Sequence, residues 1–215
     1  MKHIPFHTPA DYARAADLVT EHLLNGGLIA YPTETVYGFG CALADAPLEA
    51  LAGIKGGRED KSFLVLVANA HQLPGLIWTP AARTLAQAFW PGPLTLALRV
   101  DSNVFPARVV SAGGTVAIRV SPHVGLQEVL RRYAQPITST SANLPGQAPA
   151  HSAREVARLL ADVHAADNFL LLDGGDLEPS PSSTLVDCSD PVPRVVRAGA
   201  ITVDQLKRRV DELRS

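Results

Sequence analysis

The sequence predicts a single α/β domain, residues 1–215, built on a mixed β-sheet. Short apolar runs rich in β-forming residues alternate along the chain with segments of helical spacing, which is the pattern of α/β proteins. Some of these runs, such as residues 63–67 (FLVLV), are apolar throughout, as expected for strands covered on both faces. With 215 residues, 47% of them hydrophobic and 19% charged, the chain can bury a sizeable core, which excludes intrinsic disorder.

Helices are predicted mainly from the residues that begin them. Thr8, Thr79 and Ser121 each precede a proline, and this pair of residue types suits the N-cap and the first position of a helix. Ser152 and Thr202 each stand three residues before a Glu or Gln, which is the spacing of a capping box. The predicted helices cover residues 9–24, 45–54, 80–90, 122–133, 153–163 and 203–213.

Between the helices lie the runs expected to form strands. They are Leu28–Tyr31, Phe63–Ala68, Leu94–Val100, Thr115–Val120, Pro136–Thr140, Phe169–Asp173, Thr184–Asp187 and Arg194–Arg197. The polar, proline-rich stretch Asp176–Ser183 is expected to be a mobile surface loop.

Charge and cysteine content narrow the class of protein. A net charge of -2 argues against a surface that is basic all over, as nucleic-acid binding would favour, but leaves room for a local basic pocket. Cys41 and Cys188 have no metal-binding spacing and are expected to be free thiols in a reducing compartment. The N-terminus lacks a signal-peptide pattern, and no apolar run approaches the length of a membrane span. A cytoplasmic protein without membrane contact is therefore expected.

Several polar segments follow predicted strands or helices. Residues 31–38 (YPTETVYG) combine hydroxyls and a carboxylate, and residues 139–143 (STSAN) supply neutral hydrogen-bonding groups. Residues 55–61 (KGGREDK) suit a polyphosphate, although the order is not that of a P-loop and a solvated charged loop is the alternative. Arg119 stands in an apolar strand, where it needs an anionic partner, either a ligand or a structural ion pair.

Taken together, the motifs give the chain a family resemblance. YPTETVYGFG, the K…R…K loop, WPGPLTLAL, GTVAIRVS, TSANLPGQ, SSTLVDC and PRVVRAGAI follow in order between Leu28 and Ile201. In this the chain resembles the YrdC/TsaC family of threonylcarbamoyl-AMP synthases, in their short form with a catalytic domain alone. The resemblance implies a twisted, open mixed sheet flanked by helices around a large concave cleft. It also implies that L-threonine, bicarbonate and ATP are joined into threonylcarbamoyl-AMP, which feeds the threonylcarbamoyl transferase machinery of tRNA modification.

The resemblance also implies roles for individual residues. The residues expected to bind L-threonine are Thr35, Arg119, Ser139 and Ser183. The residues expected to bind ATP are Lys55, Arg58, Lys61, Thr115, Ser141, Asn143, Pro149 and Arg197. Lys55, Lys61 and Arg197 would assist catalysis at the phosphates. Mg²⁺ is expected to accompany ATP, with no dedicated protein ligands.

The sequence departs from the family pattern at two positions. The family loop places Arg two residues after its first Lys, whereas here Gly57 holds that position and Arg58 follows it. Many relatives also have a His in the next strand, where this chain has Leu66, so no His role carries over.

Two other functions fit parts of the pattern. A concave, cation-lined cleft could bind double-stranded RNA or tRNA without catalysis, although the near-neutral total charge weakens this alternative. A domain that forms carbamoyl-adenylate from carbamoyl phosphate is the second alternative. Such domains belong to longer chains with further domains, and the absence of zinc-finger cysteines argues against it.

Overall fold

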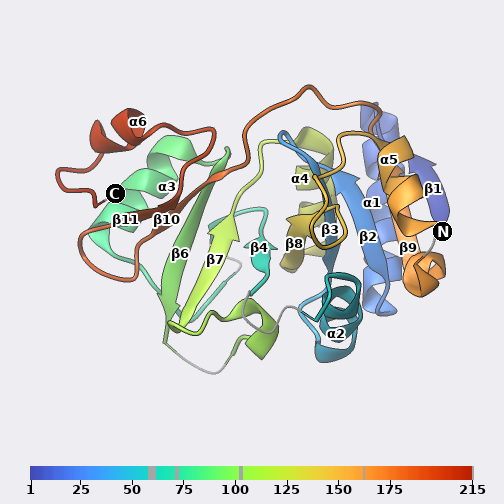
Figure 1. Cartoon of the computed structure of the whole chain (residues 1–215), viewed down its shortest axis with the longest axis horizontal. Coiled ribbons are helices and arrows are strands. Elements are labelled where there is room, and N and C mark those ends of the chain that lie inside the picture. Colours follow the sequence, from blue (N-terminus) through green and yellow to red (C-terminus); the bar gives the residue numbers. More distant parts are fainter. Residues whose placement is uncertain (58–61, 71–72, 102–103, 162, 215) are drawn as a thin grey trace.

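The computed structural model describes the chain except for residues 58–61, 71–72, 102–103, 162 and 215 (Figure 1). In this described part the strands form one mixed sheet flanked by helices, which confirms the predicted α/β fold. The strands are β1 (Lys2–Pro5), β2 (Leu28–Pro32), β3 (Tyr37–Cys41), β4 (Leu64–Leu66), β5 (Leu76–Ile77), β6 (Leu94–Val100), β7 (Thr115–Arg119), β8 (Ile137–Ser141), β9 (Phe169–Asp173), β10 (Thr184–Asp187) and β11 (Arg194–Arg197). The α-helices are α1 (Pro9–Leu24), α2 (Asp45–Ile54), α3 (Pro80–Phe89), α4 (Val124–Tyr133), α5 (Ala153–Leu160) and α6 (Val203–Lys207). Two 3-10 helices, η2 (Ala107–Val109) and η3 (His164–Asn168), complete the described elements.

The sheet has two halves that meet at β8. The strand order is β1-β9-β2-β3-β8-β4-β7-β6-β10-β11, with β5 paired to β6. β8 pairs antiparallel with β3 on one side and with β4 on the other. The pairs β2–β9, β4–β7 and β6–β10 are parallel, so the sheet is mixed as predicted. In Figure 1 the half with β6, β7 and β10 lies to the left of β8, and the half with β2, β3 and β9 lies to its right.

One side of the right-hand half is covered by α1 and α4, which pack against each other. The buried face of α1 includes Val19 and Leu23, and that of α4 includes Leu126 and Leu130. α1 begins as predicted, because the Thr8 hydroxyl accepts a hydrogen bond from the Asp11 main-chain N–H and closes a capping box. This layer shields one face of the strands on which part of the site is built.

Three strands were not predicted. β1 and β5 are short, and β3 contains two glycines, Gly38 and Gly40, a residue type that is depleted in strands. The structure shows why residue 40 is a glycine. A Cβ atom there would lie only 2.3 Å from the Thr138 carbonyl oxygen and 3.0 Å from the Tyr31 ring. The glycine permits β3 to approach its neighbours closely rather than to turn.

Three predicted helices differ in detail. The N-cap of α4 is His123, whose Nδ1 accepts from the Leu126 N–H, rather than Ser121. At α5 the capping box is incomplete, because Glu155 accepts its hydrogen bond from the His151 N–H instead of from the cap residue. α6 ends at Lys207, well before the predicted end at residue 213, although its capping box is present. No helix among the described residues is both long and apolar enough to cross a membrane.

Candidate functional site

A cavity of ≈ 230 Å³ lies beside β8, where elements from both halves of the sheet meet. Its walls come from the β2–β3 turn, the last residue of β7, the end of β8, and the segments next to β10 and β11. The residues predicted from the sequence that line it are Thr35, Arg119, Ser139, Ser141, Ser183 and Arg197. Residues more than 160 positions apart in the chain are thus brought to one hollow, mostly polar surface.

The β2–β3 turn is held by the hydroxyl of Thr33. This hydroxyl donates to the Val36 carbonyl oxygen at 2.7 Å and accepts from the Thr35 N–H at 3.1 Å. Thr33 also lies 3.0 Å, hydroxyl to hydroxyl, from Thr35, which is itself buried. A side-chain hydroxyl that forms hydrogen bonds with main-chain groups two and three residues later in the chain stabilises a tight turn. The turn therefore presents Thr35 to the cavity in one orientation.

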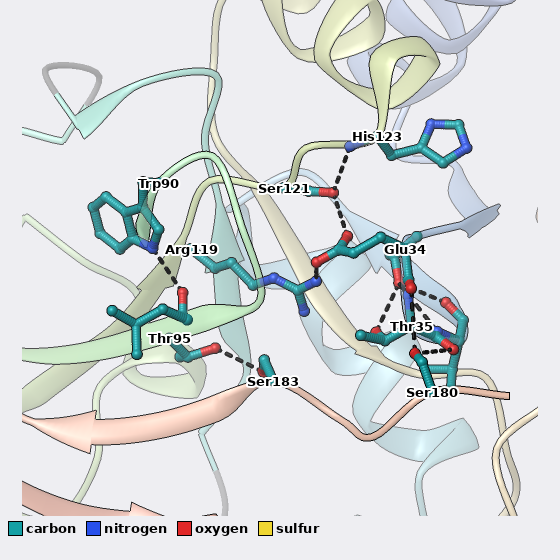
Figure 2. Close-up of polar contacts among 12 residues, drawn as sticks. Glu34, Thr35, Trp90, Thr95, Arg119, Ser121, His123, Ser180 and Ser183 are labelled. Carbon is teal, nitrogen blue, oxygen red and sulfur yellow. Dashed lines mark hydrogen bonds and ion pairs between the residues drawn. The ribbon is translucent and has the colours of Figure 1, made fainter. Parts of the chain in front are cut away.

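Arg119 is a buried cation in the cavity wall, with 6% of the residue exposed. Its Nη2 forms an ion pair with Oε1 of Glu34, and the Ser121 hydroxyl donates to Oε2 of the same carboxylate at 2.7 Å (Figure 2). Burial lowers the pKa of Arg119 to about 10, and the nearby charge of Arg197 acts in the same direction. The guanidinium is thus still cationic at neutral pH. Its Nε is buried and has no hydrogen-bond partner among the described residues, which is unusual for a buried donor.

Sequence reasoning missed Glu34 and Ser121. The need of Arg119 for an anionic partner was predicted, and the structural ion pair that was weighed as an alternative is present. Glu34 could have been suspected because it stands inside the polar turn 31–38. Its pairing with a residue 85 positions away depends on the strand order, which the sequence does not reveal.

Lys55, at the C-terminal end of α2, does not line the cavity. Its Nζ donates to the main-chain oxygens of Ser141 at 3.0 Å and Asn143 at 2.6 Å, and to Asn143 Oδ1 at 2.7 Å. Asn143 Oδ1 also accepts from the Ser141 hydroxyl at 2.6 Å, and its amide nitrogen donates to the Gln147 carbonyl oxygen. The buried ammonium therefore holds the end of β8 and the loop that follows it.

Ser183 and Arg197 also line the cavity. The Ser183 hydroxyl lies 2.9 Å from the Thr95 hydroxyl, and Arg197 Nη2 donates to the Ser183 carbonyl oxygen at 2.9 Å. The segment Asp176–Ser183, which crosses between the halves of the sheet in Figure 1, has no regular structure. Within it the Ser180 hydroxyl donates to the Glu34 carbonyl oxygen at 3.3 Å (Figure 2). This segment thus ties the β2–β3 turn to the start of β10.

The remaining predicted residues lie elsewhere. Thr115 is at the other end of β7 from Arg119, and its hydroxyl lies 2.7 Å from that of Ser111. Pro149 lines a second, more apolar cavity of ≈ 530 Å³, whose wall also includes Leu144, Gln147 and Leu159. The Asn143 amide bonds to two carbonyl oxygens of that wall, Leu144 and Gln147, so the Lys55 network lies between the two cavities. Arg58 and Lys61 lie outside the described residues.

The described side chains do not form a cluster of metal ligands. They contain no group of three or more His, Cys, Asp or Glu residues that could hold a metal ion.

Comparison with known proteins gives consistent matches. The Sua5/YciO/YrdC family model, described as telomere recombination, matches residues 21–199. A Bacillus subtilis protein named threonylcarbamoyl-AMP synthase is 35% identical over 199 residues, which are 91% of this chain and 55% of that relative. A Mycobacterium tuberculosis relative is 35% identical over 184 residues, which are 84% of this chain and 82% of the relative. The present chain thus spans about half the length of the B. subtilis relative.

A solved structure matches along the whole chain. The crystal structure of P. abyssi Sua5 complexed with L-threonine has a TM-score of 0.87 and 30% sequence identity, and the match covers 100% of this chain and 62% of that one. The elements that carry the cavity therefore have counterparts in a protein that binds L-threonine.

Proposed function

Because the chain belongs to the Sua5/YciO/YrdC family, we propose that it is an L-threonylcarbamoyladenylate synthase. This nucleotidyltransferase condenses L-threonine, bicarbonate and ATP into threonylcarbamoyl-AMP and releases pyrophosphate. The observation that carries the proposal is the cavity itself, in which buried Arg119 and the Thr35 hydroxyl face the same space as Arg197. Such a cavity offers one cation to an amino acid and a second to a polyphosphate.

The amino-acid end is proposed to be the Arg119 end. The unpartnered, buried Nε of Arg119 supports a carboxylate ligand, because an enclosed N–H without an acceptor is costly. The hydroxyls of Thr35, Ser139 and Ser183 line the same cavity and can hydrogen-bond the rest of L-threonine.

The nucleotide end is proposed to run along Ser141 and Asn143 toward the second cavity. That cavity has the apolar wall that suits a purine base, and Pro149 belongs to it. Arg197 would bind the phosphates, together with Arg58 and Lys61, which lie outside the described residues. Lys55 is proposed to act through its hydrogen bonds to Ser141 and Asn143. Thr115 is proposed to bind ATP, as the family resemblance implies.

The chemistry requires two anionic reactants to meet. The threonine amine, once it has lost its ammonium proton, combines with bicarbonate to form a carbamate and water. A carbamate oxygen then attacks the α-phosphorus of ATP, and the bond to the pyrophosphate oxygen breaks. Cations close to both reactants lower their mutual repulsion and stabilise the leaving pyrophosphate. Holding the reactants in line is worth roughly 7–11 kcal/mol in favourable cases.

Mg²⁺, if it takes part, is proposed to arrive on the ATP phosphates rather than on a protein site. No acidic or His cluster among the described residues offers it ligands.

Further proposals concern the setting of the reaction. The product is proposed to pass to a threonylcarbamoyl transferase system that modifies tRNA, with possible direct tRNA contact. Residues 1–215 are proposed to act as one catalytic domain in the cytoplasm.

Pyrophosphate release from ATP by the purified chain tests the proposal. Release should require both L-threonine and bicarbonate, and should fail when carbamoyl phosphate replaces them. Release with carbamoyl phosphate alone would support the carbamoyl-adenylate alternative. No release under any condition, together with salt-sensitive binding of double-stranded RNA, would support the RNA-binding alternative.

A further inference from the structure

The two arginines that line the cavity differ in the charge of their partners. Arg119 contacts the carboxylate of Glu34 through Nη2. Arg197 donates to the carbonyl and hydroxyl oxygens of Ser183, which carry no net charge. Among the described residues, therefore, only the first of these two cations is paired with a carboxylate.

The Glu34 carboxylate is fixed in place. Its Oε1 is enclosed against Arg119, and its Oε2 accepts from the Ser121 hydroxyl at 2.7 Å. The main chain of Glu34 belongs to the turn held by the Thr33 hydroxyl, and its carbonyl oxygen accepts from Ser180. Figure 2 shows the carboxylate lying between Arg119 and Ser121. Since both oxygens are held, the negative charge remains next to Arg119 rather than swinging into solvent.

The two arginines of the cavity thus have different electrostatic surroundings, although they lie close enough for the charge of Arg197 to act on Arg119. The part of the cavity next to each arginine is called its end. At the Arg197 end no carboxylate of the described residues is paired with the cation, which favours an anion such as a phosphate. At the Arg119 end the neighbouring carboxylate opposes a second anion. An α-amino acid meets less opposition there, because its ammonium group offsets the repulsion that its carboxylate experiences.

We propose that Glu34 is a specificity-determining residue that reserves the Arg119 end of the cavity for zwitterionic amino acids and disfavours simple anions there. This inference rests on the proposed function, because it takes Arg119 to be the residue that receives the amino-acid carboxylate. In a cavity that must also admit a polyanion, Glu34 keeps phosphates from occupying the amino-acid end.

The test compares two ligands that differ only in the ammonium group. Binding of L-threonine and of 2,3-dihydroxybutanoate of matching stereochemistry is measured by calorimetry for the wild type, Glu34→Gln and Glu128→Gln. Glu128 makes an exposed ion pair with Arg131 on α4 and provides the same change of charge away from the cavity. The wild type should prefer L-threonine. In Glu34→Gln the preference should fall at least tenfold, or about 1.4 kcal/mol, and pyrophosphate should begin to compete with L-threonine. Glu128→Gln should match the wild type.

Each outcome decides the inference. The inference is overturned if the ratio of the two affinities in Glu34→Gln stays within twofold of the wild-type ratio, or if the affinities for both ligands fall equally. Either result leaves the proposed function intact. If the wild type binds no L-threonine, the proposed function fails and the inference fails with it. If thermal unfolding shows that Glu34→Gln does not fold, Ser121→Ala serves as the second variant. This variant keeps the Glu34 charge but removes the Ser121 hydroxyl that donates to its carboxylate. The preference for L-threonine over 2,3-dihydroxybutanoate should fall two- to fivefold. An unchanged preference in that variant overturns the inference.

Discussion

Arg119 and Lys55 are both buried cations at the site, and their contacts with the described residues differ. Lys55 donates to three protein oxygens of Ser141 and Asn143, all of them uncharged. Among the described residues, Arg119 has one carboxylate partner, and its enclosed Nε has no acceptor. The difference indicates that Lys55 is mainly engaged in holding the loop after β8, whereas Arg119 has donor capacity left for a ligand.

The comparison is tested most severely by Arg119→Ala. L-threonine binding should weaken roughly 100-fold or more, because loss of one partner of a desolvated charge pair typically costs about 2–5 kcal/mol. The KM for ATP should change less than threefold. Steady-state kinetics of pyrophosphate release with each substrate varied in turn measures both effects. Arg131→Ala, an exposed arginine on α4, is the control. An unchanged dependence on L-threonine would contradict the role of Arg119.

Lys55→Ala should instead act on stability. The substitution leaves three oxygen acceptors of the Ser141–Asn143 segment without this donor. We expect a loss of about 3 kcal/mol in unfolding free energy, or roughly 6–12 °C in Tm for a domain of this size. Calorimetric or circular-dichroism melting measures it. The family resemblance alone predicts lost turnover with an intact fold, so a Tm within 2 °C of the wild type, with lost ATP turnover, would favour direct phosphate binding by Lys55.

Arg197→Ala should affect ATP use with little change in stability. Arg197 is an exposed residue, and its hydrogen bonds within the described part of the chain go to Ser183. We expect kcat/KM for ATP to fall roughly tenfold, which is about 1.4 kcal/mol, and Tm to change by less than about 2 °C. Near wild-type pyrophosphate release at low ATP would contradict its assignment to the phosphates.

Thr33→Val should give the smallest effect. It removes the hydroxyl that fixes the β2–β3 turn but keeps the shape of the side chain. We expect the KM for L-threonine to rise about three- to tenfold, since a hydrogen bond of this kind is worth roughly 1 kcal/mol. The KM for ATP should not change, because the turn belongs to the Arg119 end. Equal increases for both substrates would show that the two ends are not independent.

Much of the fold could be predicted from local sequence. Apolar runs identified most central strands, and hydroxyl–proline pairs identified the starts of α1 and α3. β3 was not predicted, because it contains two glycines, a residue type that is depleted in strands. Gly40 is needed because the backbone of Thr138, which is 98 residues away along the chain, approaches it closely.

The site was predictable in part, for a similar reason. The family motifs pointed to Thr35, Arg119, Ser139, Ser183 and Arg197, which the structure brings to one cavity. The partner of Arg119 could not be identified, because the Glu34 contact depends on how β2, β3 and β7 are placed in the sheet. Likewise, nothing in the sequence around Lys55 indicates that its ammonium group is enclosed by the chain after β8.

The position of β8 has a consequence for how the molecule comes apart. β8 is hydrogen-bonded to a strand of each half of the described sheet. Separation of the two halves at this strand would therefore leave backbone N–H and C=O groups unpaired. The two halves should therefore behave as one cooperative unit. In native-state hydrogen exchange, the amides of β8 should open only when the entire domain unfolds, although they lie beside a solvent-accessible cavity.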